Sequence, residues 1–536
     1  MIIGQRCASK LHGRRRSSCS HAANPLLLDR LARAGARRHA LGNAIDSCDY
    51  GAVLGSCPRH PRAGSMLMAP GQWAPSLPNR RELLRIGGGL ALTSLFPQGP
   101  ARVAAAPSES RLAKGGARSC ILVYLLGGPS HLDMWDLKPG APAEIRGPFR
   151  PISTSLPGLQ ICEHLPKLAR LAHQYTLVRS VSHNNHNHTP MIYYTLTGRP
   201  VDQPNLDNDV RPPQRTDFPH LGAAVARFRR SALGLPGYIA IPELAVRSST
   251  RGEFRRARTT LRGGGAGVLG PLVDPLAVNG EPGTVQAVPV LSSPSDVTAE
   301  RLERRAALLA MLENRGREVG GTRTYRELRH QALVLTGASG GASPVFSLDA
   351  EPEYLRSRYG QHRFGKALLL ARRLSTAGVP MIAIHFNEMT VCDGWDTHSK
   401  NFQALQGELL PMLDQSLSAL LEDLDQRGLL GQTLVVVMGE FGRTPRINKD
   451  AGRDHWGLCQ SVLFAGGGIK RGQVHGSSDR IGAYPASDPV DPVDIHATMY
   501  HCMGLDPLET IYDHLGRPFP LSMGRVIAPL LDNGTV

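Results

Sequence analysis

The sequence predicts an α/β fold, in which a doubly wound, mostly parallel sheet is flanked by helices. Continuous apolar runs, such as 120–126 and 433–438, are typical of strands that are buried on both faces. Segments with helical spacing separate these runs, as in the repeated strand–helix units of a parallel sheet. Polar clusters follow the runs directly, and binding sites of open α/β sheets lie beyond the carboxyl ends of the strands.

Five apolar runs are predicted to be strands because each is short and is followed by polar or glycine-rich residues. In chain order they are 120–126, 175–181, 380–386, 433–438 and 461–465. Helical spacing is found over 163–173, 193–196, 298–336, 351–377, 401–428 and 491–503. The stretch around 201–290 is rich in glycine, proline and arginine, and we expect it to be a long insertion or lid with little regular structure.

We expect the domain with this pattern to occupy residues 115–536. Residues 1–65 are rich in arginine, alanine, serine and histidine without sustained periodicity, which is typical of a disordered segment. They are either a genuine disordered leader or an extension upstream of a true start at Met66 or Met68.

Residues 66–106 contain, in order, the features of an export signal. Paired Arg80 and Arg81 precede the short apolar segment 86–96, and small residues at 103–106 supply a cleavage site. The arginine pair resembles a twin-arginine signal, which exports proteins that are already folded. We therefore expect the mature protein in the periplasm or outside the cell.

The formal charge of +16 is concentrated in these leading segments. Residues 1–106 contain 15 lysines and arginines and 4 acidic residues, which leaves about +5 for the remainder. This small charge gives no reason to expect a nucleic-acid partner. No apolar stretch of about 20 residues follows the signal segment, so we expect no membrane span in the mature form. The nine cysteines show no zinc-knuckle spacing and do not select a disulfide pairing.

Two polar clusters follow the first two predicted strands. The first contains His131 and Asp133, which could supply nitrogen and oxygen ligands, although a loop closed by turns explains it equally well. The second has three histidines within six residues, at His183, His186 and His188. Neutral imidazole is a common ligand of zinc. A helix that begins here would also attract phosphate or sulfate to its amides.

Two further clusters follow the runs at 380–386 and 433–438. Asp396 and His398 are two residues apart, so a looped backbone can aim both at one ion. Glu440 lies where a metal ligand or a general base would be placed, and the guanidinium of Arg443 can bind a tetrahedral anion.

The fifth cluster is the neighbouring pair Asp454 and His455 in a loop. Consecutive residues can each ligate one of two ions that lie about 4 Å apart. Mixed carboxylate and imidazole ligands suit zinc, manganese or iron better than calcium. Each cluster alone could be structural, as an Asp–His hydrogen bond or a Glu–Arg ion pair. Five clusters that follow strands of one sheet favour a functional site.

From Cys120 to about Leu531 the chain resembles the domain of unknown function 1501 family of exported bacterial proteins. The matching stretches are GGPSHLDMWDLKPG, HTPMIYYTLTGRP, DGWDTHSKNF, LLEDLDQRGLLGQTLVVVMGEFGRTPRIN, GRDHWG and FAGGGIKRGQVHGSSD. That family is similar to the alkaline phosphatase superfamily, which includes sulfatases and cofactor-independent phosphoglycerate mutases. The resemblance implies an alkaline-phosphatase-like fold and a divalent metal, for which zinc, manganese and calcium are the candidates.

The resemblance also implies roles for individual residues. His188 and Thr189, followed by the Leu-Thr-Gly-Arg stretch at 196–199, resemble the sulfatase sequence around its modified nucleophile. Either residue could therefore be the nucleophile, and His188 could instead bind metal. Asp396 with His398 resembles an Asp–His pair that binds one metal.

Glu440 and the later pair Asp454-His455 resemble a strand end that supplies further ligands. The chain also departs from the superfamily pattern. Gly127-Gly128 replaces an aspartate after the first strand, so His131 or Asp133 would have to substitute for it. The nucleophile position holds neither cysteine nor serine, which argues against formylglycine chemistry.

Two functions follow from these features. The first is an exported metal-dependent hydrolase of phosphate or sulfate esters, acting on a small-molecule or polysaccharide substrate. The second is a non-catalytic secreted binding or scaffold protein that retains the fold.

Overall fold

The computed structural model describes residues 116–532, with gaps at 202–211, 232–233, 248–257, 289–290, 292–296, 314–321, 337–342, 387–393 and 514. The predicted leader and signal segment, 1–65 and 66–106, lie outside the described residues, as does part of the stretch 201–290. No helix within the described ranges is long and apolar enough to cross a membrane.

An eight-stranded sheet forms the centre of the domain, in the order β14-β4-β13-β10-β1-β9-β5-β8. β13 is antiparallel to both of its neighbours, whereas the other neighbouring pairs are parallel. The prediction of a doubly wound, mostly parallel sheet is therefore confirmed. The strands are β1 (Ser119–Leu125), β4 (Tyr175–Val181), β5 (Tyr238–Ile241), β8 (Leu276–Ala277), β9 (Met381–Phe386), β10 (Thr433–Met438), β13 (Gln460–Ala465) and β14 (Gln473–His475).

The central strands are buried along their whole length and mostly apolar, because both faces of the sheet are covered. Neighbouring residues of β1 point to opposite sides, so that Ile121 packs in one hydrophobic core and Leu122 in the other. In the sheet, Ile121 lies between Val435 of β10 and Ile382 of β9. The continuous apolar runs in the sequence thus reflect burial on two faces.

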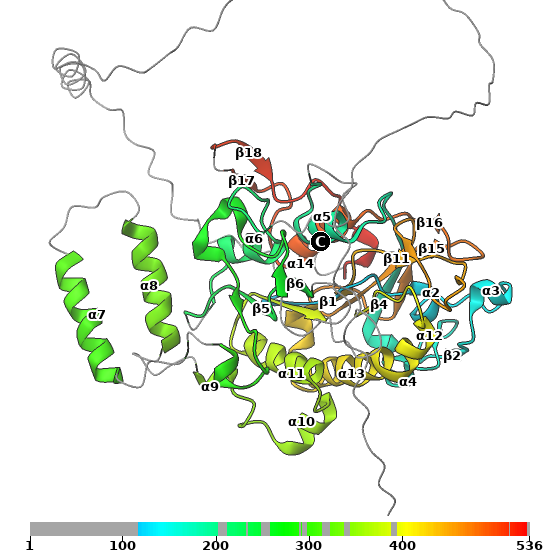
Figure 1. Cartoon of the computed structure of the whole chain (residues 1–536), viewed down its shortest axis with the longest axis horizontal. Helices are drawn as coiled ribbons and strands as arrows, with labels where there is room; N and C mark the ends of the chain where they lie inside the picture. Colours follow the sequence, from blue (N-terminus) through cyan, green and yellow to red (C-terminus); the bar gives the residue numbers. More distant parts are fainter. Residues whose placement is uncertain are drawn as a thin grey trace, which may run out of the picture. The chain divides into compact units, whose positions relative to one another are not determined.

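Helices form one layer on each face of the sheet, and Figure 1 shows α10, α11 and α13 on one side and α5, α6 and α14 on the other. The first layer comprises α4 (Pro166–Arg170), α10 (Glu353–Tyr359), α11 (Arg363–Thr376) and α13 (Leu410–Gln426). The second layer comprises α5 (His188–Thr197), α6 (Leu221–Phe228) and α14 (Pro492–Cys502).

Further elements complete the described chain. The remaining helices are α2 (His131–Met134), α3 (Ala143–Arg146), α7 (Ala299–Glu313), α8 (Thr322–Thr336), α9 (Ser343–Phe346) and α12 (Asn401–Ala404). Two-stranded sheets pair β2 (Pro151–Ser153) with β3 (Gln160–Cys162), β6 (Ala245–Arg247) with β7 (Arg258–Thr260), β11 (Gly442–Arg443) with β12 (His455–Trp456), β15 (Ser477–Ser478) with β16 (Pro485–Ser487), and β17 (Thr510–Tyr512) with β18 (Pro518–Pro520). The 3-10 turns are Ala172–Gln174, Gly267–Leu269, Pro271–Val273, Val285–Ala287, Leu430–Gln432 and Ala528–Leu530.

The long helix predicted over 401–428 is interrupted near its start. A π-helical turn at Leu405–Leu409 separates α12 from α13. Pro411 lies in the first turn of α13, where its missing N–H cannot complete the regular hydrogen-bond ladder with the preceding turn. The interruption therefore has a local cause that is visible in the sequence.

The prediction of little regular structure around 201–290 is wrong for the described part of that stretch. It supplies β5 and β8 to the central sheet and α6 to one helical layer. β5 and β8 have four and two residues, too short to stand out among the surrounding glycines and prolines. β5 is placed in the sheet by pairing with β9, which lies far along the chain, and β8 pairs with β5.

The described cysteines do not pair. Cys120, Cys162, Cys459 and Cys502 are buried free thiols. Burial raises the pKa of Cys162 and of Cys459 to about 12, so both thiols stay protonated near neutral pH. Their role is packing.

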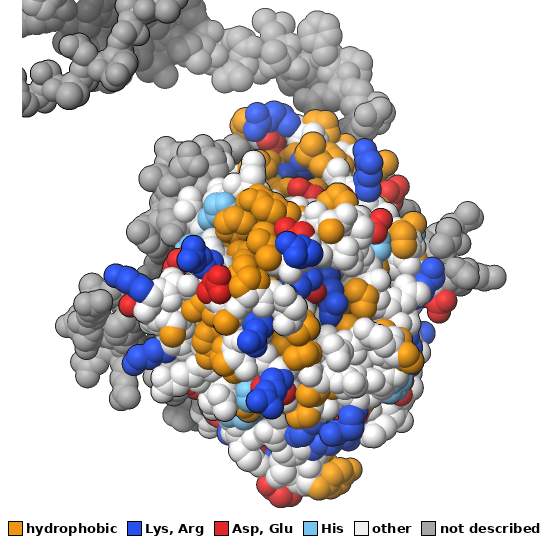
Figure 2. Space-filling model, turned by 90° about the vertical axis from the view of Figure 1, so that its right-hand side faces the viewer, with side chains coloured by type: hydrophobic (Ala, Val, Ile, Leu, Met, Phe, Trp, Pro, Cys, Tyr) orange, Lys and Arg blue, Asp and Glu red, His pale blue; other side chains and the backbone are white. Residues whose placement is uncertain are grey.

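On the face of the domain shown in Figure 2, basic and acidic side chains are intermixed rather than segregated by sign.

Candidate metal centre

Loops beyond the carboxyl ends of three parallel strands carry the side chains of the site. β4 is followed by α5, whose first residue is His188. β9 leads to Asp396 and His398, and β10 leads directly to Glu440. The hairpin β11–β12, which follows β10, carries His455. The parallel arrangement therefore brings residues from four distant segments to one edge of the sheet.

We use the term ligand cluster for His188, Asp396, His398 and His455. Each offers one potential ligand atom, and these atoms all lie within 4.8 Å of one another. Asp396 is central, because its Oδ2 is 3.4 Å from His188 Nε2 and its Oδ1 is 3.2 Å from His398 Nε2. His455 Nε2 is 3.3 Å from the same Oδ1 and 2.7 Å from His398 Nε2.

A second hydrogen bond fixes the orientation of each imidazole ring in the cluster. His188 Nδ1 donates to Glu440 Oε1 at 2.7 Å, and His398 Nδ1 donates to Asp454 Oδ1 at 2.9 Å. His455 Nδ1 donates to the backbone carbonyl of His186 at 2.7 Å. Carboxylate and carbonyl oxygens only accept, so Nδ1 of each ring carries a hydrogen, and a ring that gives up its second proton directs the Nε2 lone pair at the cluster. This pattern of outer-shell support is typical of histidines that bind metal.

The facing nitrogens of His398 and His455 call for a positive charge beside both rings. Two Nε2 lone pairs 2.7 Å apart repel unless a proton or a metal ion lies between them. Glu440 gives a second indication, because its Oε2 is buried and has no hydrogen-bond partner among the described residues. Buried polar atoms normally have a partner. Three imidazoles and one carboxylate are a ligand set that suits zinc or manganese.

The carboxylate of Asp396 is bound by a buried arginine, Arg443. Arg443 Nη2 donates to Asp396 Oδ1 at 2.5 Å, and its Nε donates to the carbonyl of Gly128 at 2.8 Å. The same guanidinium also donates to the carbonyls of Gly127 and Arg453, and its side chain is 0% exposed. Arg443 was expected to hold a tetrahedral anion, but in the structure its donors bind Asp396 and the backbone.

The electrostatics concentrate negative charge at the centre of the site. Burial raises the pKa of Asp396, but hydrogen bonds from His188, His398 and His455 outweigh it and hold the pKa well below its usual range. Burial lowers the pKa of His188, but hydrogen bonds to Asp396 and Glu440 raise it more, to about 9. Asp396 therefore stays ionised and attracts positive charge.

The site is open on one side. The side chains of His398 and Asp454 are 44% and 55% exposed, whereas Glu440 is 0% exposed. A ligand can therefore approach past His398, with Glu440 forming the closed rear wall.

His131 and Asp133, the residues expected to replace a missing aspartate, lie outside the ligand cluster. His131 Nε2 shares a hydrogen bond of 2.8 Å with the carbonyl of Gly482. Asp133 forms a two-pronged ion pair with Arg453, at 2.7 Å to Nε and 2.9 Å to Nη2, and both side chains are fully buried. Asn401 also donates to Asp133.

This role of Arg453 could not be predicted from the sequence, because its partner lies 320 residues away. The only signal was a basic residue in the polar loop that ends at Asp454 and His455.

The glycine pair after β1 has a steric explanation. Gly127 and Gly128 have φ values of 116° and 74°, which disfavour any other residue. A Cβ on Gly127 would also clash with the backbone of Trp395 and Asp396. The amide of Gly127 donates to Glu440 Oε1 at 2.9 Å. An aspartate at this position would therefore displace the loop that carries Asp396.

Thr189 occupies the first turn of α5, directly after His188. The side chain of the N-cap residue Asn187 makes no capping hydrogen bond to the helix. The amides at the start of this ten-residue helix are therefore not capped by that side chain, and such amides can bind an anion.

The fold and the ligand cluster together define an α/β protein with a candidate metal centre at the carboxyl edge of a doubly wound sheet. The chain belongs to the family described as "Protein of unknown function (DUF1501)", whose model matches residues 117–531. This confirms the resemblance found in the sequence. Comparison with curated proteins finds no match.

Several solved structures are similar to this chain at low identity. A phosphonate monoester hydrolase from Silicibacter pomeroyi is 15% identical, with 77% of this chain and 76% of that chain covered and a TM-score of 0.30. A sulfatase from Pseudoalteromonas sp. is 12% identical, with 80% and 72% covered and a TM-score of 0.32. A magnesium-bound TAB5 alkaline phosphatase variant is 10% identical, with 73% and 99% covered and a TM-score of 0.30. Likenesses at this level do not assign a function to the chain.

Replacing Glu440 with glutamine is expected to weaken metal binding by about 10- to 100-fold, which is the usual effect of losing an outer-shell partner of a histidine ligand. The neutral amide is a weaker acceptor for His188 Nδ1 than the carboxylate at 2.7 Å. Titration against a competing chelator measures the change. Unchanged affinity would show that Glu440 does not support His188, and complete loss at saturating metal would identify it as a direct ligand.

Proposed function

We propose that this chain is an exported, metal-dependent hydrolase of phosphate or sulfate esters. The observation that carries the proposal is the ligand cluster, which includes His188, the first residue of α5. A divalent cation and an anion-binding helix terminus are the two elements that hydrolysis of such esters requires. The twin-arginine-like segment at 66–106 supports export to the periplasm or beyond the cell.

The ligand cluster would hold one divalent ion, with zinc or manganese favoured over calcium by its three imidazoles. When bound, the ion would supply Lewis-acid polarisation of an ester oxygen. Glu440 and Asp454 would act behind His188 and His398, orienting the two rings through the hydrogen bonds already described.

We assign Arg443 to the positioning of Asp396 rather than to contact with the substrate. Its guanidinium is fully buried and binds Asp396 and four backbone carbonyls, those of Gly127, Gly128, Trp395 and Arg453. It supplies a fixed positive charge next to the carboxylate and keeps it ionised. The amides at the start of α5 would then bind the anionic group of the ester.

Thr189 is the nucleophile in this proposal, because His188 is already bound by Glu440 and faces Asp396. Its hydroxyl lies on the first turn of α5, at the anion-binding end of the helix. Replacing Thr189 with alanine should abolish turnover while leaving metal content unchanged, and serine should restore part of the activity. Turnover by the alanine variant equal to wild type would assign the attack to a water molecule instead.

The first experiment is a turnover assay of the mature protein on aryl sulfates, phosphate monoesters and phosphate diesters, with added zinc, manganese or calcium. We expect hydrolysis of at least one ester class that is lost after chelation and restored by one metal. Elemental analysis of the same sample gives the identity and number of bound ions. Hydrolysis that persists after complete metal removal would contradict the proposal.

A non-catalytic binding protein is the second candidate. The observation in its favour is Arg443, since the cation expected to grip the substrate is buried against backbone carbonyls. This candidate predicts a metal-loaded protein that hydrolyses none of the esters. The combination of elemental analysis and turnover therefore separates the two functions.

A further inference from the structure

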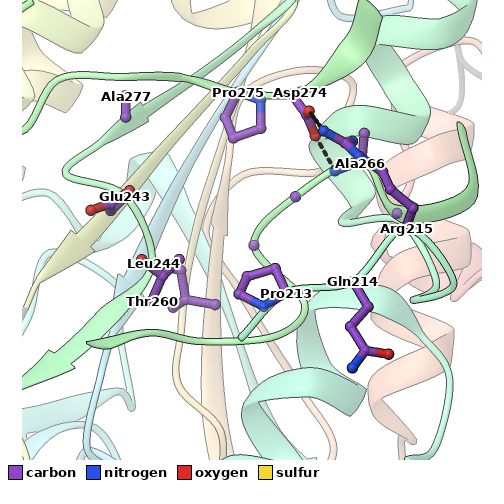
Figure 3. Close-up of a pocket in the computed structure, with 13 residues that line it drawn as sticks. Pro213, Gln214, Arg215, Glu243, Leu244, Thr260, Ala266, Asp274, Pro275 and Ala277 are labelled. Carbon is purple, nitrogen blue, oxygen red and sulfur yellow. Dashed lines mark hydrogen bonds and ion pairs between the residues drawn. The ribbon is translucent and has the colours of Figure 1, made fainter. Parts of the chain in front are cut away.

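A pocket separate from the ligand cluster lies beside β5 and β8. Its volume is about 340 Å³, and Figure 3 shows the side chains that surround it. Glu243 and Thr260 lie on one side of the hollow, and the ion pair between Arg215 and Asp274 lies on the other. The backbone of 264–267 forms part of the wall. This volume is at the lower end of the range found for small-ligand sites.

The pocket and the ligand cluster share one edge of the sheet. Glu243 follows the carboxyl end of β5, and β5 pairs in parallel with β9, which leads to Asp396. The loop that lines the pocket also contacts the helix that carries His188, because Gly263 packs against Tyr193 of α5. Two to three strand spacings of about 4.8 Å separate the two places, or roughly 10–15 Å along the edge.

Glu243 and Thr260 differ from the other polar side chains of the pocket. The carboxylate of Glu243 and the hydroxyl of Thr260 make no side-chain hydrogen bond or ion pair within the described chain. Arg215, in contrast, is neutralised by Asp274 at 2.5 Å, and Asp274 also accepts from the amide of Ala266 at 2.9 Å. The pocket therefore carries a free negative charge and disfavours a second anionic group.

The walls between these groups are apolar. Pro213, Leu244 and Pro275 line the pocket between the carboxylate and the ion pair. A ring with hydroxyl groups at its rim and C–H groups on its faces matches this combination, since its hydroxyls donate to Glu243 and its faces pack on proline and leucine.

We propose that this pocket binds an uncharged sugar unit of a saccharide ester whose sulfate or phosphate lies at the ligand cluster. The inference rests on the proposed function for the ester, and it adds the substrate class. The separation of roughly 10–15 Å corresponds to two or three sugar units. The pocket therefore holds a different sugar unit from the one that carries the ester. Glu243 and Thr260 select the substrate through its hydroxyl groups.

The test is binding of neutral, ester-free oligosaccharides to the metal-loaded protein, first on a glycan array and then by calorimetry with the strongest binder. We expect the wild-type protein to bind one class of oligosaccharide. Glu243→Gln should weaken that binding at least about tenfold, as expected for loss of a charge-assisted hydrogen bond. Thr260→Val should weaken it severalfold.

The matched control is Glu509→Gln, because Glu509 is an exposed glutamate that does not line the pocket. This variant should bind the sugar like the wild type. No binding by the wild-type protein would overturn the inference, as would equal binding by the Glu243 and Thr260 variants. An equal loss in the Glu509 variant would also overturn it. Turnover does not enter this measurement, so a failure of the hydrolase proposal would leave the binding result intact.

Discussion

Replacing Asp396 and His398 together with alanine is expected to remove the bound metal and to lower kcat/KM at least about 1,000-fold. Asp396 is the one residue that contacts all three histidines of the ligand cluster, through distances of 3.2–3.4 Å. Its loss leaves imidazoles without the carboxylate that neutralises a divalent ion, and the loss of His398 removes a second ligand. Elemental analysis and turnover of the purified variant measure both effects.

The control for this variant is Asp425→Ala. Asp425 pairs with Arg471 at 3.1 Å on the surface and lies outside the site. Its substitution should leave metal content and turnover unchanged. If the Asp396 and His398 double variant kept the metal of the wild type, the ligand cluster would not be the metal centre.

Replacing Asp133 with asparagine is expected to lower the free energy of unfolding by about 3–5 kcal/mol, as is typical when one partner of a buried ion pair is removed. The change leaves the guanidinium of Arg453 charged in a place where both side chains are 0% exposed. Arg453 also donates to the carbonyls of Thr444 and Ile145, so its displacement would loosen the loop that leads to His455. Chemical denaturation in the presence of chelator measures the effect without a contribution from metal.

Two further variants show whether the loss of charge pairing causes the lower free energy of unfolding. Asp133→Asn combined with Arg453→Met should be less destabilised than the sum of the two single variants, because neither charge is then left alone. Asp425→Asn breaks only the surface pair with Arg471 and should cost no more than about 1 kcal/mol. Loss of metal from the Asp133 variant without loss of stability would instead return Asp133 to the list of ligands.

The apolar runs identified the central strands correctly because their burial on two faces leaves a strong local pattern. The run at 433–438 coincides with β10, and 175–181 coincides with β4. β5 and β8 escaped prediction because two to four residues carry no such pattern. The position of β5 depends on pairing with β9, which only the folded chain brings near, and β8 then pairs with β5.

The sequence by itself determined the doubly wound sheet and the polar clusters that follow its strands, because both depend on residues that are close along the chain. Only the tertiary structure decided which of those polar residues join the ligand cluster and which form other ion pairs. It groups His188, a candidate nucleophile or ligand, with the predicted ligand Asp396, and it turns Asp133, the expected substitute for a missing aspartate, toward Arg453. Charge pairing across hundreds of residues leaves no local pattern, so donors and acceptors can be predicted from the sequence, but their partners are set by the packing of the loops.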